Sequence, residues 1–187
     1  MNGVRIVKKE NHKLIFIEKE GIPQINMEVN RKWAMPNHLT FSIKPIKELL
    51  EKHIGDGKDW IDPFANNSET VEITNDSNPE CNTKFHLDAF DFGKILEGTH
   101  KGILFDPPYS MHQTNQMYEG FGLRKQVSMI MDMFADKIEI GGYAISFGWS
   151  SNGFGKKRGF EIEEILLVAH GGWHNDTIVT VERKIGD

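Results

Sequence analysis

The sequence predicts an α/β fold whose sheet is doubly wound, mostly parallel and closed by an antiparallel C-terminal hairpin. Short apolar runs alternate with segments of helical period from about residue 45 onward, and the last two runs follow each other without a helix between them. With 187 residues, 39% of them hydrophobic, the chain is long enough for one domain with a core and too short for two of ordinary size. We therefore expect residues 1–187 to form a single domain.

The first predicted elements precede the core. Residues 1–36 are expected to form an N-terminal arm or short strands, because apolar bursts at 4–7 and 14–17 are separated by turn residues. Apolar positions at helical spacing then predict a helix over about 45–54, with Pro45 in its first turn and Gly55 and Gly57 after its end.

Strands and helices alternate through the rest of the chain. Strands are predicted at 60–64, 71–74, 103–105, 143–147, 160–168 and 177–182. A short helix is predicted around 91–96 and a longer one over about 123–138, with an apolar face that includes Phe134 and Ile138.

Composition excludes several classes of protein. No apolar run approaches the ~20 residues of a membrane span, and the N-terminus lacks a secretory apolar region, so we expect a soluble, cytoplasmic protein. The lone Cys81 excludes an intramolecular disulfide, and the eight histidines show no tight ligand spacing, so no metal site is expected. A net charge of −5 argues against binding nucleic acid over the whole surface.

The strand at 103–105 ends in Asp106-Pro107-Pro108-Tyr109, which groups four unlike chemical functions. Asp106 and the carbonyl of Pro107 can each accept a hydrogen bond from an exocyclic amine, and the prolines carry no competing N–H donor. Tyr109 can stack on the face of the ring that bears the amine. The pattern therefore indicates a rigid site for a flat amino-substituted ring at the carboxyl edge of a sheet.

This stretch resembles the D-P-P-Y motif of the amino-methyltransferases, which move a methyl group from S-adenosylmethionine to adenine N6 or a related amine. The order of segments from about residue 37 to 184 is similar to the S-adenosylmethionine-dependent DNA adenine-N6 methyltransferases. The resemblance implies a Rossmann-like class I methyltransferase fold with S-adenosylmethionine as cofactor. It also implies a compact core without a target-recognition domain, because only 43 residues lie between Asp62 and Asp106.

The resemblance also implies the cofactor-binding residues. The segment 40–46 resembles the family's segment that helps hold the methionine end of the cofactor, and 62–65 resembles its D-P-F-x-G-x-G turn. An acid after the second strand and an acid near the cofactor's adenine complete the set. The residues implied are Thr40, Phe41, Ile43, Pro45, Asp62, Pro63, Phe64, Ala65, Asp76, Asp88 and Ala89.

Two of the three acids in this set have structural alternatives. Asp76 can bind the two ribose hydroxyls or cap an Asx-type turn in the polar segment 75–79. Asp88 can accept from the cofactor's adenine amine or cap the following helix. Asp62 is expected to bind the cofactor's amino group, because it lies at the end of a strand and before Pro63, where an aspartate has little structural role.

The sequence departs from the family at the cofactor turn and directly after it. Asn66 and Asn67 stand where the family has glycines, and asparagine tolerates positive φ better than most residues. Residues 64–71 leave room for a loop only, so the usual crossover helix is absent or a single turn, and the first unit is irregular or its two strands do not pair as in the family.

Two further segments are candidates for contact with nucleic acid. Trp149 follows a core strand and can form a wall of the base pocket, although a tryptophan there can also belong to the core. Lys156, Lys157 and Arg158 form a basic, glycine-flanked loop, for which the alternative is a solvated surface loop.

These features together predict an enzyme that transfers a methyl group to adenine N6 in DNA. One alternative is methylation of a base amine in RNA, because pocket shape chooses the base. Another is a non-catalytic methyltransferase-like subunit that binds a partner. The net charge of −5 and the lack of a target-recognition domain would make sequence-specific DNA binding by a monomer weak, so we further expect a homodimer or a separate recognition partner.

Overall fold

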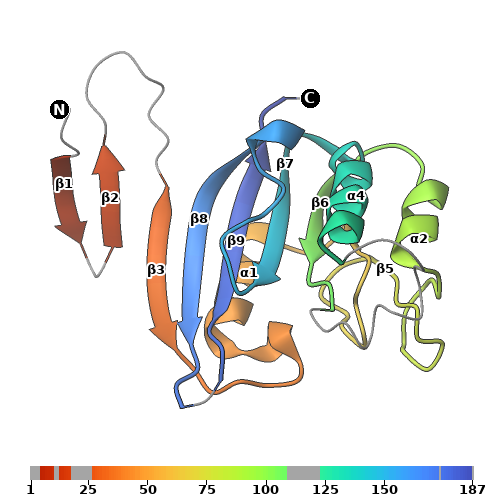
Figure 1. Ribbon diagram of the computed structural model, residues 1–187, viewed down its shortest axis with the longest axis horizontal. Helices are drawn as coiled ribbons and strands as arrows, with labels where there is room; N and C mark the ends of the chain where they lie inside the picture. The colour runs from red at the N-terminus through yellow and green to blue at the C-terminus, as the bar shows by residue number, and fades with distance from the viewer. Residues whose placement is uncertain (1–4, 11–12, 18–26, 109–122, 173, 187) are drawn as a thin grey trace.

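A computed structural model describes residues 5–10, 13–17, 27–108, 123–172 and 174–186 of the chain (Figure 1). Its described strands form one sheet in the order β1-β2-β3-β8-β9-β7-β6-β4-β5. The strands are β1 Arg5–Glu10, β2 Lys13–Ile17, β3 Glu28–Trp33, β4 Trp60–Asp62, β5 Ile73–Thr74, β6 His100–Phe105, β7 Ile138–Gly148, β8 Phe160–Ala169 and β9 Thr177–Lys184. The helices are α1 Lys44–Ile54, α2 Ala89–Ile95 and α4 Leu123–Ala135, with 3-10 turns η1 Thr40–Ser42 and η2 Lys156–Arg158.

Strand directions confirm the predicted fold class. Strands β5, β4, β6 and β7 pair in parallel, and β9 is antiparallel to both β7 and β8, so β8 runs in the same direction as β7. From β4 the chain adds β5 on one side and later β6 on the other. The boundary between β4 and β6 is therefore a topological switch point, where open α/β sheets bind their ligands beyond the carboxyl ends of the strands.

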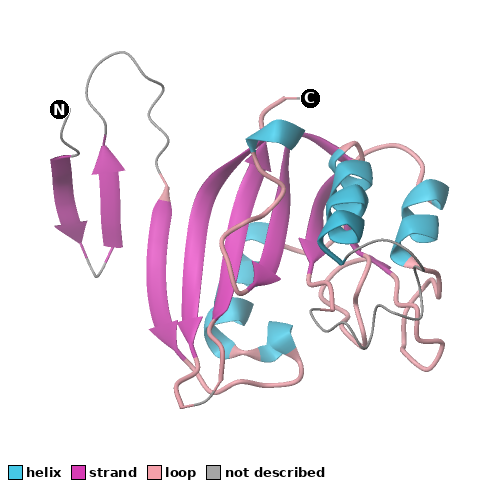
Figure 2. Ribbon diagram, viewed as in Figure 1, coloured by secondary structure: helices cyan, strands magenta, loops and turns pink. Residues whose placement is uncertain are grey.

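Helices cover both faces of the sheet (Figure 2). Helix α1 packs Ile46 and Leu50 on one face, against a cluster that includes Leu104 of β6. Helices α2 and α4 pack on the other face, where Ile103 and Phe105 of the same strand point. Both faces of β6 are thus buried, which explains why this strand is a continuous apolar run.

Most predicted elements are confirmed, but several boundaries were wrong: β4 ends at Asp62 instead of 64, β6 begins at His100 instead of 103, and β7 begins at Ile138 instead of 143. Helix α4 ends at Ala135 instead of 138, because the Lys137 N–H bonds to the Phe134 carbonyl and the buried Lys184 ammonium donates to the Ala135 carbonyl. Ile138 therefore begins β7, although it still packs in the same cluster as Phe134. Strand β5 is also shorter than expected and spans only Ile73–Thr74.

Two features were not resolved by sequence reasoning. Strands β4 and β5 pair in parallel through Ile61 with Ile73 and Asp62 with Thr74, although residues 63–72 between them contain no helix. Strand β3 was not predicted, and it pairs in parallel with β8 along its whole length. No helix within the described ranges is long and apolar enough to cross a membrane.

Candidate functional site at the carboxyl edge of the sheet

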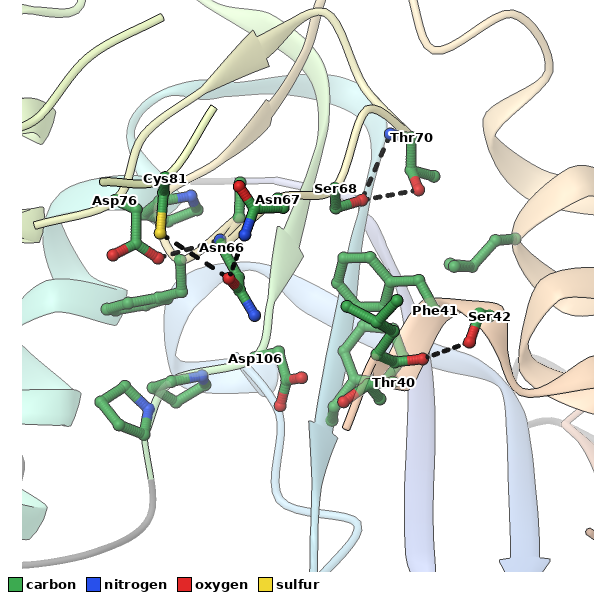
Figure 3. A pocket seen from close by; sticks show the side chains of 18 of the residues that line it. Thr40, Phe41, Ser42, Asn66, Asn67, Ser68, Thr70, Asp76, Cys81 and Asp106 are labelled. Carbon is green, nitrogen blue, oxygen red and sulfur yellow. Dashed lines mark hydrogen bonds between the residues drawn. The ribbon is translucent and has the colours of Figure 1, made fainter. Parts of the chain in front are cut away.

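A cavity of about 1200 Å³ opens at the carboxyl edge of the sheet, beside the switch point. Its walls come from η1, the loops after β4 and β5, the residues before α2, and the ends of β6 and β7. Figure 3 shows Asp106 between the Thr40–Ser42 turn and the Asn66-Asn67 turn. The topology thus brings together segments from more than half of the chain's length.

The predicted catalytic motif lies in the cavity wall directly after β6. Asp106, Pro107 and Pro108 all line the cavity, and the Pro107 ring is buried. The prolines cannot continue the β6 ladder, so the chain leaves the sheet at this point. Tyr109 lies outside the described residues, and its stacking role stays a prediction.

Asp62 is fully buried at the end of β4, behind the cavity wall. Its Oδ1 accepts the Phe64 N–H at 3.0 Å, whereas Oδ2 has no hydrogen-bond partner among the described residues. Burial raises the pKa of Asp62 well above its ordinary value, and the nearby charges of Asp106 and Asp76 raise it further. A ligand that brings a cation or an N–H donor would stabilise such a buried carboxyl group.

The two asparagines of the predicted cofactor turn have clear structural roles. Asn66 adopts φ +52°, a left-handed conformation that asparagine accepts more readily than most residues. Its N–H donates to Asp76 Oδ2 at 2.9 Å, and the Asn67 Oδ1 accepts the Asn82 N–H at 2.9 Å. The turn therefore forms without the family's glycines, through hydrogen bonds to the loop after β5.

Asp76 lines the cavity and also caps an Asx turn, because its Oδ1 accepts the Asn78 N–H at 2.9 Å. The predicted structural alternative is thus present. A carboxylate offers about four lone-pair sites, so ribose binding stays a compatible prediction. The buried Cys81 lies in the same wall, and its thiol donates to Asn66 Oδ1 at 3.7 Å. Burial, followed by the charge of Asp76, raises the pKa of this thiol.

Asn75 is an organising residue that sequence reasoning did not assign. Its fully buried side chain donates to the carbonyls of Pro63 at 3.1 Å and Leu87 at 2.9 Å, and accepts the Leu87 N–H at 3.0 Å. Its backbone also bonds to Asp62 and Ala65. One amide side chain therefore fixes two opposite loops of the cavity. The available signal was an asparagine directly after an apolar strand, beside the predicted acid.

The remaining cofactor candidates divide into lining and supporting residues. Asp88 caps α2 through a 2.8 Å bond from the Phe90 N–H, as its structural alternative predicted, while its neighbour Ala89 lines the cavity. Thr40 and Phe41 line the cavity opposite, and Pro63, Phe64 and Ala65 line it after β4. Ile43 and Pro45 are buried beneath η1 and do not line it.

The candidates for contact with nucleic acid lie at opposite edges of the sheet. Trp149 follows β7, lines the cavity and is 63% exposed, so it is not a core residue. Lys156, Lys157 and Arg158 precede β8, whose ten residues place them roughly 30 Å away at the amino edge. Arg158 there bonds to Asp132 and Ser128 of α4. The structure does not bring this basic loop to the cavity.

Among the described residues, no group of three or more histidine, cysteine or acidic side chains is arranged to hold a metal ion.

Comparisons with known proteins place the fold. No protein-family model and no curated protein matches the sequence. Among solved structures, a precorrin-6y C5,15-methyltransferase from Geobacter metallireducens is similar with a TM-score of 0.54 and 10% identity, over 82% of this chain and 94% of that one. The 1,6-didemethyltoxoflavin-N1-methyltransferase of Burkholderia thailandensis, solved with S-adenosylhomocysteine, has a TM-score of 0.53 and 12% identity, over 76% and 78%.

TrmN from Thermus thermophilus has a TM-score of 0.50 and 16% identity over 76% of this chain. The chain spans about half of TrmN, 49% of its length. At these identities the likeness concerns the fold alone. Together with the strand order, it shows that the chain has the Rossmann-like fold of class I methyltransferases.

Proposed function

We propose that the protein is an S-adenosylmethionine-dependent methyltransferase that acts on the exocyclic N6 amine of adenine in DNA. The observation that carries the proposal is the position of Asp106-Pro107-Pro108. These residues leave the central strand β6 at the switch point and line a cavity large enough for two ligands. Its volume of about 1200 Å³ exceeds the usual range for one small-molecule site, so a cofactor and an extruded base can share it.

The residues present fit S-adenosylmethionine. Asp62 Oδ2 lies behind the cavity wall and has no hydrogen-bond partner among the described residues, so it would suit the cofactor's ammonium group, which brings both charge and N–H donors. Asp76 carries the acceptors that a ribose diol needs, and Ala89 stands with Leu87 at the wall where an adenine ring would lie. The segment Thr40–Ser42 lies across the cavity from Asp76 and would cover the methionine end (Figure 3).

The chain's own residues would orient the amine and stabilise its charge. S-adenosylmethionine, when bound, supplies a methyl group that is already electrophilic, so the site needs no strong base. The Asp106 carboxylate and the Pro107 carbonyl would accept the two amine hydrogens and aim the nitrogen lone pair along one line. As the new C–N bond forms and the methyl–sulfur bond breaks, these acceptors stabilise the positive nitrogen, and its proton passes through Asp106 to solvent.

Titration calorimetry with S-adenosylmethionine and S-adenosylhomocysteine, followed by methyl transfer to mixed DNA and RNA with nucleoside mass analysis, tests the proposal. Micromolar binding with N6-methyladenine in DNA supports it. Methylation confined to RNA would move the substrate to the alternative class. Absence of cofactor binding would favour the non-catalytic subunit.

The role of Asp106 is tested separately with Asp106→Ala. We expect turnover to be abolished while S-adenosylhomocysteine affinity stays within a few-fold, because Asp106 holds the amine and not the cofactor. Turnover within about tenfold of the parent would refute the role. Asp91→Ala is the matched control, since Asp91 is exposed and pairs only at the surface with Lys94.

Recognition of a DNA sequence is proposed to require a homodimer or a separate partner protein. Sedimentation velocity of the protein with and without DNA tests this. A lone monomer that methylates one sequence specifically would contradict it.

A further inference from the structure

Half of the exposed large apolar side chains among the described residues lie at the carboxyl edge of the sheet. Eight are exposed among the described residues, and four of them belong to segments at the carboxyl edge of the sheet. We call these four the tryptophan rim: Trp33, Met35, Leu39 and Trp149. The other four are scattered over α2, α4 and the amino edge, as isolated apolar residues commonly are.

The tryptophan rim is continuous with the cavity. Trp149 and Leu39 line the cavity itself. Trp33 ends β3, and its indole nitrogen lies beside Gly171, where an added Cβ would be 3.3 Å away. Gly171 belongs to the connection between β8 and β9, and that connection leads to Thr177 in the cavity wall.

Hydrogen bonds connect the segments beneath the tryptophan rim. The buried His170 bonds through Nδ1 to the Ala34 carbonyl and through Nε2 to Thr177 Oγ1, each at 2.8 Å. The Ala34 N–H also donates to the Ala169 carbonyl. Thr177 begins β9, and the next residue, Ile178, pairs with Gly148 at the end of β7. These bonds connect the strand end that carries Trp33 to the one that precedes Trp149. Three strand spacings of about 4.8 Å separate β3 from β7, which gives roughly 14 Å.

Charge argues against a duplex at this edge. Duplex binding depends on clustered lysine and arginine that neutralise phosphates, and the consecutive basic run 156–158 lies at the amino edge. The chain as a whole carries −5. Stacking on an aromatic ring needs the open face of an unpaired base, which a duplex hides, and it fits two indoles that are 64% and 63% exposed.

We infer that the tryptophan rim binds an unpaired nucleic-acid strand, with Trp33 and Trp149 stacking on bases that flank the one entering the cavity. A span of roughly 14 Å corresponds to about four stacked nucleotides. The inference rests on the proposed function for the base that reacts. It adds that the substrate is single-stranded or locally opened nucleic acid, and that Trp33 helps to hold it.

Fluorescence anisotropy tests the inference without turnover. The probe is a fluorescein-labelled mixed-sequence single-stranded DNA oligonucleotide, compared with its duplex at physiological salt, and the protein is saturated with S-adenosylhomocysteine. We expect the single strand to bind at least about tenfold more tightly than the duplex. Trp33→Ala and Trp149→Ala should each weaken single-strand binding by about fivefold to a hundredfold, while Trp33→Phe retains most of it.

The matched control is Ile140→Ala, because Ile140 is equally exposed but lies near the start of β7 at the amino edge. It should leave the affinity unchanged. Equal or tighter binding of the duplex would overturn the inference, as would unchanged single-strand affinity in both tryptophan variants. A dimer that dissociates on Trp33→Ala, with no change in oligonucleotide affinity, would overturn it in favour of a second copy.

Failure of the single-strand inference can be distinguished from failure of the proposed methyltransferase function. Methylation of duplex DNA by a protein whose tryptophan variants bind normally would overturn only the inference. Single-strand binding that depends on Trp33, without methylation of any nucleic acid, would support the inference and overturn the proposed function.

Discussion

Replacing Asn75 tests whether one buried amide holds the cavity together. Asn75→Ala removes three side-chain hydrogen bonds, and it leaves the Leu87 N–H and the carbonyls of Pro63 and Leu87 without these partners. Each lost bond costs about 1 kcal/mol, and a buried group left unpaired costs up to about 3 kcal/mol. We expect a loss of about 3 kcal/mol in the free energy of unfolding, a large share of the 5–15 kcal/mol that is typical of whole domains.

The assay combines urea denaturation with calorimetric titration of S-adenosylhomocysteine. Because Asn75 fixes the loops after β4 and before α2, Asn75→Ala should weaken cofactor binding as well as stability. Asn75→Asp keeps the size and the acceptor for the Leu87 N–H, but it turns a carboxylate oxygen toward two carbonyls. Burial and the two carbonyls should raise the pKa of this carboxyl group above its unfolded value of about 3.9, so the stability deficit should shrink as pH falls toward about 4, because the protonated group regains a donor.

The matched control is Asn82→Ala, since Asn82 is exposed and its side chain donates only to Glu69 at 3.2 Å. We expect less than about 1 kcal/mol of destabilisation and unchanged cofactor affinity. If Asn75→Ala falls within about 0.5 kcal/mol of this control, the reasoning about Asn75 is refuted.

Three further predictions concern charge and backbone conformation. Burial, followed by the charges of Asp106 and Asp76, raises the pKa of Asp62 above its unfolded value of about 3.9. The free energy of unfolding of the cofactor-free protein should therefore fall as pH rises above about 3.9. Denaturation of Asp62→Asn at a series of pH values should not show this fall. Burial opposes ionisation of Glu164, but hydrogen bonds from His53 and Lys52 outweigh it and lower its pKa to about 2. Ionised Glu164 should contribute about 2 kcal/mol to the free energy of unfolding, a value reduced because Lys52 is half exposed. This contribution is complete above about pH 4.3 and is lost as pH falls through about 2. Acid titration of Glu164→Gln should not show that loss. Asn66→Gly should keep cofactor affinity because glycine accepts the φ of +52°, whereas Asn66→Val should lose about 1–2 kcal/mol by thermal unfolding, and equal melting temperatures for the two would contradict the strained turn.

Sequence reasoning located the main elements of the candidate site because they depend on local chemistry. The apolar run before Asp106 requires a buried strand, and the prolines that follow require that strand to end, whatever surrounds it. The N-cap at Asp88 and the Asx turn at Asp76 are likewise bonds to residues two positions away. Patterns of this kind are complete within a few residues.

Other features depended on contacts between distant segments. Helix α4 stops at Ala135 partly through Lys184, 49 positions later in the chain, and β3 becomes a strand by pairing with β8. The role of Asn75 depends on loops that the sheet brings to its two sides. No local pattern contains these partners, so local propensity could not reveal them.

The sequence by itself determined the doubly wound α/β class and the placement of Asp106 after a buried strand, because hydrophobic period and proline chemistry act within each segment. Only the tertiary structure decided which chemical groups share the cavity. Strand direction places Trp33 and Trp149 at the carboxyl edge and the basic loop 156–158 at the amino edge. The physical reason is that parallel strands all end at one edge of a sheet, so side chains far apart in sequence meet there, while a loop that crosses to the next strand leaves that edge.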